Sequence, residues 1–277
     1  MEMMKQVLTI AGSDSGGGAG IQADIKTFQE LGVYSTSVIT AVTAQNTQGV
    51  TDIYPMARNA VEKQLDAIGT DFQIAALKTG MLFQADIIEA TAQGIKKYDW
   101  QNVVVDPVMI AKGGASLLQK EAVSALIKHL LPLATIVTPN IPEAEVLSGL
   151  EIHDSISRLR VAERIIATGA KAVVIKDGHG TNRFFTEDFY LDYLGDSMII
   201  RSPRIVTNQT HGTGCTFSAA LTAELAKGKK MGEALYTAKQ FIYAALAHPL
   251  HIGSGHGPTN HAAYNKAAVK EVVQLVK

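Results

Sequence analysis

The stretch Thr210-His211-Gly212-Thr213-Gly214-Cys215-Thr216-Phe217-Ser218 places two glycines directly before the only cysteine of the chain. Small and apolar residues continue to Gly228, which predicts a tight turn that opens a helix ending at that glycine. The first amides of a helix have no partners within it, and Gly212 and Gly214 let the backbone approach a bound group closely. We therefore expect this turn to bind an anion.

Cys215 stands at the beginning of this predicted helix. The field of a helix N-terminus favours a thiolate, and the pKa of a thiol, normally about 8.5, falls to roughly 3.5–7.5 in such places. We expect a Cys215 of lowered pKa that handles a proton beside a phosphoryl group. The alternative is a small buried hydrophobic residue next to a glycine-rich turn without further function.

A second glycine-rich segment, Gly12–Gly20, follows the apolar run Gln6–Ala11, and residues 21–31 show helical spacing. The segment is not the dinucleotide pattern G-x-G-x-x-G, because Ile21 stands at the third glycine, and no G-K-[ST] follows as in a P-loop. We interpret it as a loop whose backbone approaches a small ligand, with Asp24 available to accept a hydrogen bond. The alternative is a flexible loop with a solvated Asp24.

Short apolar runs alternate with helical patterns along most of the chain. The predicted strands are 33–44, 75–77, 103–105, 135–138 and 172–175, with shorter β segments in 182–201, and the predicted helices are 57–69, 85–97, 120–131, 141–147, 152–167, 232–247 and about 262–276. This alternation predicts an α/β fold with a mainly parallel central sheet and helices on both faces. No linker or repeat divides the sequence, so we expect one domain over residues 1–277.

In such sheets, ligands bind outside the carboxyl ends of the strands. This rule gathers at one edge the segments Gly12–Gly20 and Gly212–Cys215 and the residues Gln45, Met81, Asp106, Asn140, Glu143 and Lys176. The carboxylates of Asp106 and Glu143 suit Mg²⁺, which prefers few protein oxygens together with phosphate and water. Lys176 and Lys112 add positive charge, so the edge predicts phosphoryl transfer, which needs mainly positioning and charge neutralisation.

Structural explanations exist for both carboxylates. Asp106 precedes Pro107 and would cap a turn, and Glu143 falls in the first turn of a predicted helix, where acidic residues are common. The three histidines of the Gly/His/Pro segment His251–His261 favour a mobile surface loop over a metal site, since no other ligand type stands beside them.

Composition excludes several classes of protein. The 277 residues are 47% hydrophobic, which is ample for a sizeable core, and 25 basic against 26 acidic residues leave a net charge of −1. We therefore expect no nucleic-acid partner and no membrane surface partner. One cysteine excludes an internal disulfide, and no signal peptide or membrane-spanning run is visible, so we expect a cytoplasmic protein.

Several motifs resemble the hydroxymethylpyrimidine/phosphomethylpyrimidine kinases of thiamine biosynthesis, in the ribokinase-like superfamily. In chain order the matching stretches are Leu8–Asp14, Gly17–Asp24, Ala44–Thr47, Lys78–Met81, Asp106–Met109, Thr138–Asn140 with Glu143-Ala144, Thr210–Phe217 and Gly255–Pro258. The resemblance spans almost the whole chain and implies a ribokinase-like fold, ATP and Mg²⁺ as cofactors, a small-molecule substrate and a homodimer.

The resemblance also implies roles for individual residues. The residues expected to line a pyrimidine pocket are Gly12, Ala19, Asp24, Val42, Gln45, Met81 and Val108, with Gln45 reading the ring edge. The turn residues Gly212, Thr213 and Gly214 are expected to form an anion hole, with Cys215 as the catalytic base. The residues expected to face ATP are Asp106, Lys112, Asn140, Glu143 and Lys176, with Asp106 and Glu143 toward the metal. Asp177 stands where a glycine is expected, which puts the geometry of the ATP loop in question.

The implied reaction phosphorylates the hydroxymethyl group of 4-amino-5-hydroxymethyl-2-methylpyrimidine and then its monophosphate. Pyridoxal kinases are close relatives, and those active on pyridoxal tend to carry a cysteine where this chain has Ala111, so phosphorylation of pyridoxal or pyridoxine stays the alternative. A non-catalytic vitamin-binding protein is less favoured because Cys215, Asp106 and Glu143 are all present. A nicotinamide oxidoreductase is disfavoured by the missing third glycine.

Overall fold

The structure is a computed structural model that describes residues 4–109, 120–178, 180, 182–266 and 272–276. The strands are β1 (Gln6–Asp14), β2 (Tyr34–Asn46), β3 (Gly49–Pro55), β4 (Ile74–Thr79), β5 (Val103–Val105), β6 (Ile136–Val137), β7 (Ala172–Ile175), β8 (Phe185–Asp192), β9 (Ser197–Pro203) and β10 (Gln274–Val276). Within the described residues they form one sheet in the order β10-β9-β8-β7-β6-β5-β4-β1-β2-β3. The centre, from β7 to β2, is parallel, and antiparallel strands extend both edges.

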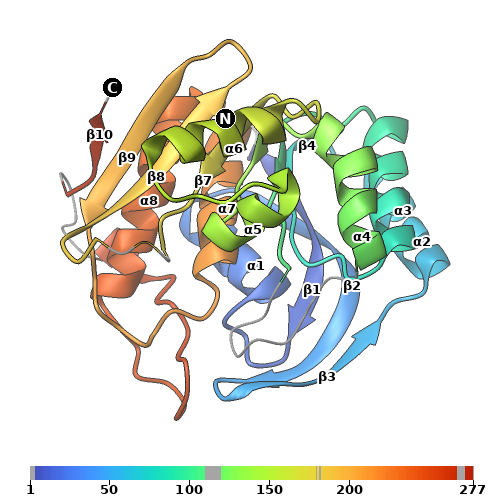
Figure 1. Ribbon diagram of the computed structural model, residues 1–277. Coiled ribbons are helices and arrows are strands. Elements are labelled where there is room, and N and C mark those ends of the chain that lie inside the picture. Colours follow the sequence, from blue (N-terminus) through green and yellow to red (C-terminus); the bar gives the residue numbers. More distant parts are fainter. Residues whose placement is uncertain (1–3, 110–119, 179, 181, 267–271, 277) are drawn as a thin grey trace.

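Two helical layers cover the sheet (Figure 1). The helices are α1 (Gly20–Glu30), α2 (Arg58–Gly69), α3 (Ala85–Lys97), α4 (Lys120–Ala125), α5 (Ile141–Ser148), α6 (Ser155–Ile166), α7 (Thr213–Ala226), α8 (Met231–Ala247) and α9 (Ala263–Lys266). Helices α2 to α6 share one hydrophobic core with the sheet, and α1, α7 and α8 share a second core on the opposite face. The expected α/β fold with helices on both faces is therefore confirmed.

The central strands are apolar because both of their faces are buried. In β5, Val103 and Val105 belong to the first core, whereas Val104 belongs to the second. The same alternation holds in β7, where Val173 and Val174 point to opposite cores. Strands of this kind end at the same edge, which fixes the positions of the polar residues that follow them.

The structure corrects two helix predictions. Residues 120–131 are not one α-helix, since α4 ends at Ala125 and continues as a π-helical segment, Leu126–Leu130, and a 3-10 segment, Leu131–Leu133. The predicted helix at about 262–276 is wrong at its end: among the described residues there, α9 spans Ala263–Lys266, and β10 pairs antiparallel with β9. Pairing with an open sheet edge overrides the local helical spacing there.

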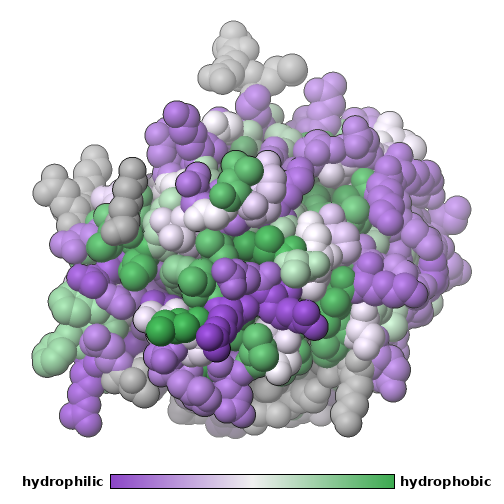
Figure 2. Space-filling view, turned by 45° about the horizontal axis from the view of Figure 1, so that its top comes forward, coloured by the Kyte–Doolittle hydropathy of each residue, from purple (hydrophilic) through white to green (hydrophobic). Residues whose placement is uncertain are grey.

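No helix in the described ranges is long and apolar enough to cross a bilayer. Figure 2, in which the top of Figure 1 comes forward, shows hydrophilic residues over much of this face, with hydrophobic residues between them in the middle of the view.

Candidate active site

A cavity of about 340 Å³ lies at the carboxyl ends of the parallel strands. Its wall includes these sequence-predicted residues: Gly12, Ala19, Gln45, Met81, Asp106, Val108, Asn140, Glu143, Lys176, Gly212, Thr213, Gly214 and Cys215. They come from the ends of six strands and the beginning of α7, because parallel strands release the chain at one edge. The convergence expected from the sequence is therefore present.

Two of the sequence-predicted residues that the structure describes do not line this cavity. Asp24 has no exposed area, because α1 turns its side chain toward the sheet, where Lys78 Nζ and Thr9 Oγ1 bond its two carboxylate oxygens. Val42 pairs with Ser13 in the β1–β2 ladder and is 42% exposed, outside the cavity wall. Lys112 lies outside the described residues, as does Ala111. Direct substrate contact by Asp24 is thus not the arrangement found here.

The glycine-rich loop after β1 is folded around a residue that the sequence analysis did not select, Asp14. Its carboxylate accepts the backbone N–H groups of Gly16, Gly18 and Ala19 at 2.8–3.0 Å. Its Oδ2 also lies 2.7 Å from Nε2 of His211, another cavity residue that was missed. Burial opposes the charged carboxylate, but the His211 ring and these amides outweigh it and lower the pKa of Asp14. The sequence signal for such a turn is an aspartate followed closely by glycines, as in Asp14–Gly18.

The turn before α7 requires a glycine at Gly212 and brings Gly214 close to the charged residues of the cavity. Gly212 caps the helix with φ of +82°, and a Cβ there would overlap the carbonyl of Gly18. At Gly214 a Cβ would lie 3.4 Å from Lys176 Nζ and 3.7 Å from Asp106 Oδ2. The glycine loop, the turn and the charged pair are therefore in close contact at the N-terminus of α7.

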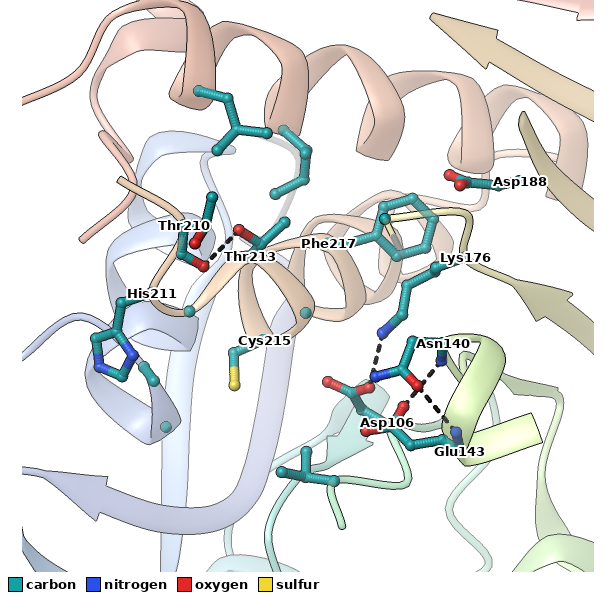
Figure 3. Close-up of a pocket in the computed structure, with 18 of the residues that line it drawn as sticks. Asp106, Asn140, Glu143, Lys176, Asp188, Thr210, His211, Thr213, Cys215 and Phe217 are labelled. Carbon is teal, nitrogen blue, oxygen red and sulfur yellow. Dashed lines mark hydrogen bonds and ion pairs between the residues drawn. The ribbon is translucent and has the colours of Figure 1, made fainter. Parts of the chain in front are cut away.

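Cys215 lies in the cavity wall, between His211 and the Asp106–Lys176 pair in the view of Figure 3. Burial raises the pKa of Cys215 to about 11; the Lys78 ammonium opposes this rise, and the carboxylates of Asp24 and Asp106 add to it. The expected lowering of the pKa is therefore wrong. Loss of hydration outweighs the helix field, which is worth about 0.3–2 kcal/mol.

Asp106 and Lys176 form a buried ion pair at one end of the cavity. Lys176 Nζ lies 3.1 Å from Oδ1 of Asp106, and Thr138 and Ser218 donate hydroxyl hydrogen bonds to the same carboxylate. Although burial opposes ionisation, Lys176 and Lys78 hold the pKa of Asp106 below its usual value. Both residues line the cavity, and the ammonium of Lys176 is a compact positive charge of the kind that binds phosphate.

Asn140 and Glu143 form a capping box at the beginning of α5. Asn140 Oδ1 accepts the amide of Glu143, and Glu143 Oε2 accepts the amide of Asn140, both at 2.9 Å. Burial raises the pKa of Glu143 to about 7, against the effect of Lys176. The structural explanation for Glu143 therefore holds, and it fixes this carboxylate at the cavity wall.

The far wall carries a second buried pair, Asp188 and Lys239, at 2.7 Å. Asp177, which stands where a glycine was expected, extends this network: its carboxylate accepts the amide of Glu187 and pairs with Arg204. Its side chain therefore ties the loop after β7 to β8 and to the residue that follows β9.

The segment His251–His261 differs from the expected mobile loop. His251 and His256 are exposed, but His261 is buried, with Nε2 3.1 Å from Thr216 Oγ1. The amide of His211 donates to Gly257, and that of Thr259 donates to His211. The segment thus braces the turn before α7, and in the described residues no group of three or more His, Cys, Asp or Glu forms a metal cluster.

Known proteins share this sequence and this fold. The profile of the phosphomethylpyrimidine kinase family matches residues 14–260. A hydroxymethylpyrimidine/phosphomethylpyrimidine kinase of Haemophilus influenzae is 58% identical over 268 residues, which cover 96% of this chain and 100% of that protein.

Two solved pyridoxal kinases superpose on nearly the whole chain. That of Bacillus subtilis, in an ADP complex, has a TM-score of 0.89 and 42% identity, and the match covers 96% of this chain and 100% of the other. That of Staphylococcus aureus, in complex with AMP-PCP and pyridoxal, has a TM-score of 0.88 and 38% identity, with coverages of 99% and 98%. On the sequence match and the shared fold, this chain belongs to the phosphomethylpyrimidine kinase family.

Proposed function

We propose that the protein phosphorylates the hydroxymethyl group of 4-amino-5-hydroxymethyl-2-methylpyrimidine with ATP, and then phosphorylates the monophosphate, in thiamine biosynthesis. The observation that carries this proposal is the composition of the cavity wall. Gln45, Met81 and the glycine loop supply one region for a small ring, and the Asp106–Lys176 pair supplies another for phosphates, with Cys215 in the same wall. The name of the 58% identical relative supports the same reaction.

In the proposed reaction, the hydroxymethyl oxygen attacks the γ-phosphorus of ATP in line, and the bond to the β–γ bridging oxygen breaks to release ADP. Lys176 and the amides of the turn at Gly212–Cys215 neutralise charge on the phosphoryl group. Cys215 takes the proton of the hydroxyl. Because its pKa is about 11, most molecules carry the neutral thiol at pH 7, and the thiolate fraction is the active base.

Magnesium fits this site as a hydrated ion. The two candidate carboxylates already hold protein donors: Asp106 bonds Thr138, Lys176 and Ser218, whereas Glu143 accepts the amides of Asn140 and Met109. Mg²⁺ keeps several waters and binds through few carboxylates plus phosphates. We propose that Asp106 and Glu143 hold the ion through water, and that when bound it neutralises the β- and γ-phosphates.

Pyridoxal phosphorylation remains a second candidate, because two structurally similar proteins are pyridoxal kinases and the structure of one of them is a complex with AMP-PCP and pyridoxal. Both acceptors are six-membered nitrogen-containing rings that carry a hydroxymethyl group, and in both reactions this group would lie at the same point of the cavity. A homodimer in the cytoplasm belongs to the same proposal and has the family resemblance as its support.

The test measures ADP release with hydroxymethylpyrimidine, its monophosphate, pyridoxal and pyridoxine as acceptors. The proposal expects the two pyrimidines to have the highest kcat/KM, and Cys215→Ala to lower kcat far more than it raises the KM for ATP. Turnover of pyridoxal alone would replace the first candidate with the second. Unchanged turnover in Cys215→Ala would remove the thiol from the mechanism.

A further inference from the structure

Lys78 and Asp24 form an ion pair with no solvent contact. Lys78 Nζ lies 2.8 Å from Asp24 Oδ1, Thr9 Oγ1 donates to Oδ2 at 2.6 Å, and both charged side chains are 0% exposed. Removing two charges from water costs several kcal/mol per ion, and apolar replacements of such pairs are often equally stable. Stability alone therefore gives a weak reason for this pair.

The pair lies directly behind the cavity wall. Lys78 is on β4, and its Nζ would be 3.5 Å from a Cβ on Gly80, the residue before the cavity residue Met81. Asp24 is on α1, whose first residue, Gly20, lines the cavity together with Cys215. The pair therefore occupies the layer between the sheet and the helices that carry the glycine loop and the thiol.

Charged groups from four elements act on Cys215. The ammonium of Lys78 on β4 stabilises the thiolate, and the carboxylates of Asp24 on α1 and Asp106 after β5 oppose it. Lys176 after β7 also interacts with the thiol, but it is already paired with Asp106. Helix α7, which carries Cys215, packs against both β4 and α1, the two elements that carry Lys78 and Asp24. The pair and the thiol therefore belong to one packed unit, in which the Lys78 ammonium favours the thiolate.

We propose that Lys78 is a positioning residue for catalysis, a buried ammonium that stabilises the Cys215 thiolate and is held in place by Asp24 and Thr9. Its catalytic consequence rests on the proposed kinase function, whereas its effect on the thiol does not. The thiolate accepts the hydroxyl proton as the oxygen bonds to phosphorus and ADP leaves. The resulting thiol later returns this proton to water. Lys78 keeps its own proton throughout.

The chain offers a direct measurement, because Cys215 is its single cysteine and alkylation by iodoacetamide therefore reports on this thiol alone. The rate is followed from pH 7 to 10.5 in four proteins: wild type, Asp24→Asn, Lys78→Met and the double variant. Lys78→Met alone leaves the buried Asp24 without its ion-pair partner and could fail to fold. In the double variant both side chains are uncharged, so the measurement stays possible. Circular dichroism confirms which variants are folded.

The proposal predicts the order in which the alkylation profiles of these proteins shift with pH. The alkylation profile should move to lower pH in Asp24→Asn and to higher pH in Lys78→Met by about one unit or more, with the double variant between wild type and Lys78→Met. Lys227→Met is the matched control, because Lys227 is also ion-paired and lies at the other end of α7. It should leave the profile unchanged.

Steady-state kinetics distinguish the effect of Lys78 on the thiol from the proposed kinase function. The double variant should lose about tenfold or more in kcat with an unchanged KM for ATP, since Lys78 does not touch the cavity. Wild-type alkylation profiles in both the double variant and Lys78→Met would overturn the proposal even if kinase activity is present. Absence of kinase activity in the wild type, with the expected alkylation order intact, would instead remove the proposed function.

Discussion

Nε2 of His211 lies 2.7 Å from Oδ2 of Asp14, although 197 residues separate them in the chain. The contact joins the glycine loop after β1 to the turn before α7, and both residues line the cavity. Because the Asp14 carboxylate also accepts amides of its own loop, one side chain fixes both glycine-rich segments relative to each other.

Asp14→Ala should therefore disturb acceptor binding more than ATP binding. Removal of the carboxylate leaves three amides of the loop, one of them in a buried hydrogen bond, and His211 without this partner. We therefore expect the KM for the acceptor to rise about tenfold or more and stability to fall by about 1–3 kcal/mol. Steady-state kinetics and urea unfolding measure both. Asp154→Ala is the control, because Asp154 caps α6 away from the cavity, and it should lower stability by about 1 kcal/mol without changing either KM. Equal KM effects in the two variants would contradict the prediction.

One part of the cavity wall was predictable because its polar residues directly follow recognisable parallel strands. Asp106 directly follows the apolar strand Val103–Val105, and Lys176 directly follows Ala172–Ile175. Parallel strands end at one edge, so strand ends alone predict which polar residues meet. The rule needs no side-chain detail and works across long sequence separations.

What escaped prediction depends on side-chain direction and on burial. Helical spacing shows that Asp24 lies in α1 but not that Lys78 of another element takes its carboxylate. The His211–Asp14 contact needs the three-dimensional turn, and the pKa of Cys215 depends on loss of water, which the helix position alone does not give. At the C-terminus, β10 owes its extended form to the free edge of β9.

Alanine substitutions of two glycines at opposite ends of α7 distinguish a steric overlap from the cost of a positive φ. Both have positive φ, +82° at Gly212 and +79° at Gly228, but a Cβ on Gly228 meets no described atom within 4 Å. Gly228→Ala should therefore cost about 1–2 kcal/mol of stability and leave kcat/KM unchanged. Gly212→Ala adds an overlap with the Gly18 carbonyl, and displacement of the turn should lower kcat/KM about 100-fold. Similar kinetics in the two variants would show that the close approach of these loops has no catalytic importance.

The pH dependence of kcat/KM tests the base. This ratio reports ionisations of the free enzyme, in which the pKa of Cys215 is about 11. If the thiolate is the active form, kcat/KM should rise nearly tenfold per pH unit from pH 7 to 9, because only a small fraction is ionised there. Cys215→Ala should give a lower, flat profile. A wild-type profile that is already flat between pH 7 and 9 would exclude the thiolate as the base.

His261 should make the stability of the protein depend on pH in weak acid. Burial, with a smaller contribution from Lys26, lowers the pKa of His261 to about 4, against an ordinary value of 6.5. Between these values the unfolded chain binds a proton that the folded protein does not. The free energy of unfolding therefore falls as the pH falls from 6.5 to 4, by up to about 3 kcal/mol, and the full stability is present above 6.5.

Urea unfolding of wild type and His261→Gln at pH 7.5, 6, 5 and 4.5 isolates this contribution from other titrating groups. Glutamine retains a polar group for Thr216 but takes up no proton, so the wild type should lose more stability than the variant on acidification, and the difference should grow below pH 6.5. His153→Gln is the matched control, since the His153 side chain is 72% exposed. Parallel losses in wild type and His261→Gln would mean that His261 takes up its proton without breaking the contact with Thr216, and that the brace on the turn before α7 is insensitive to acid.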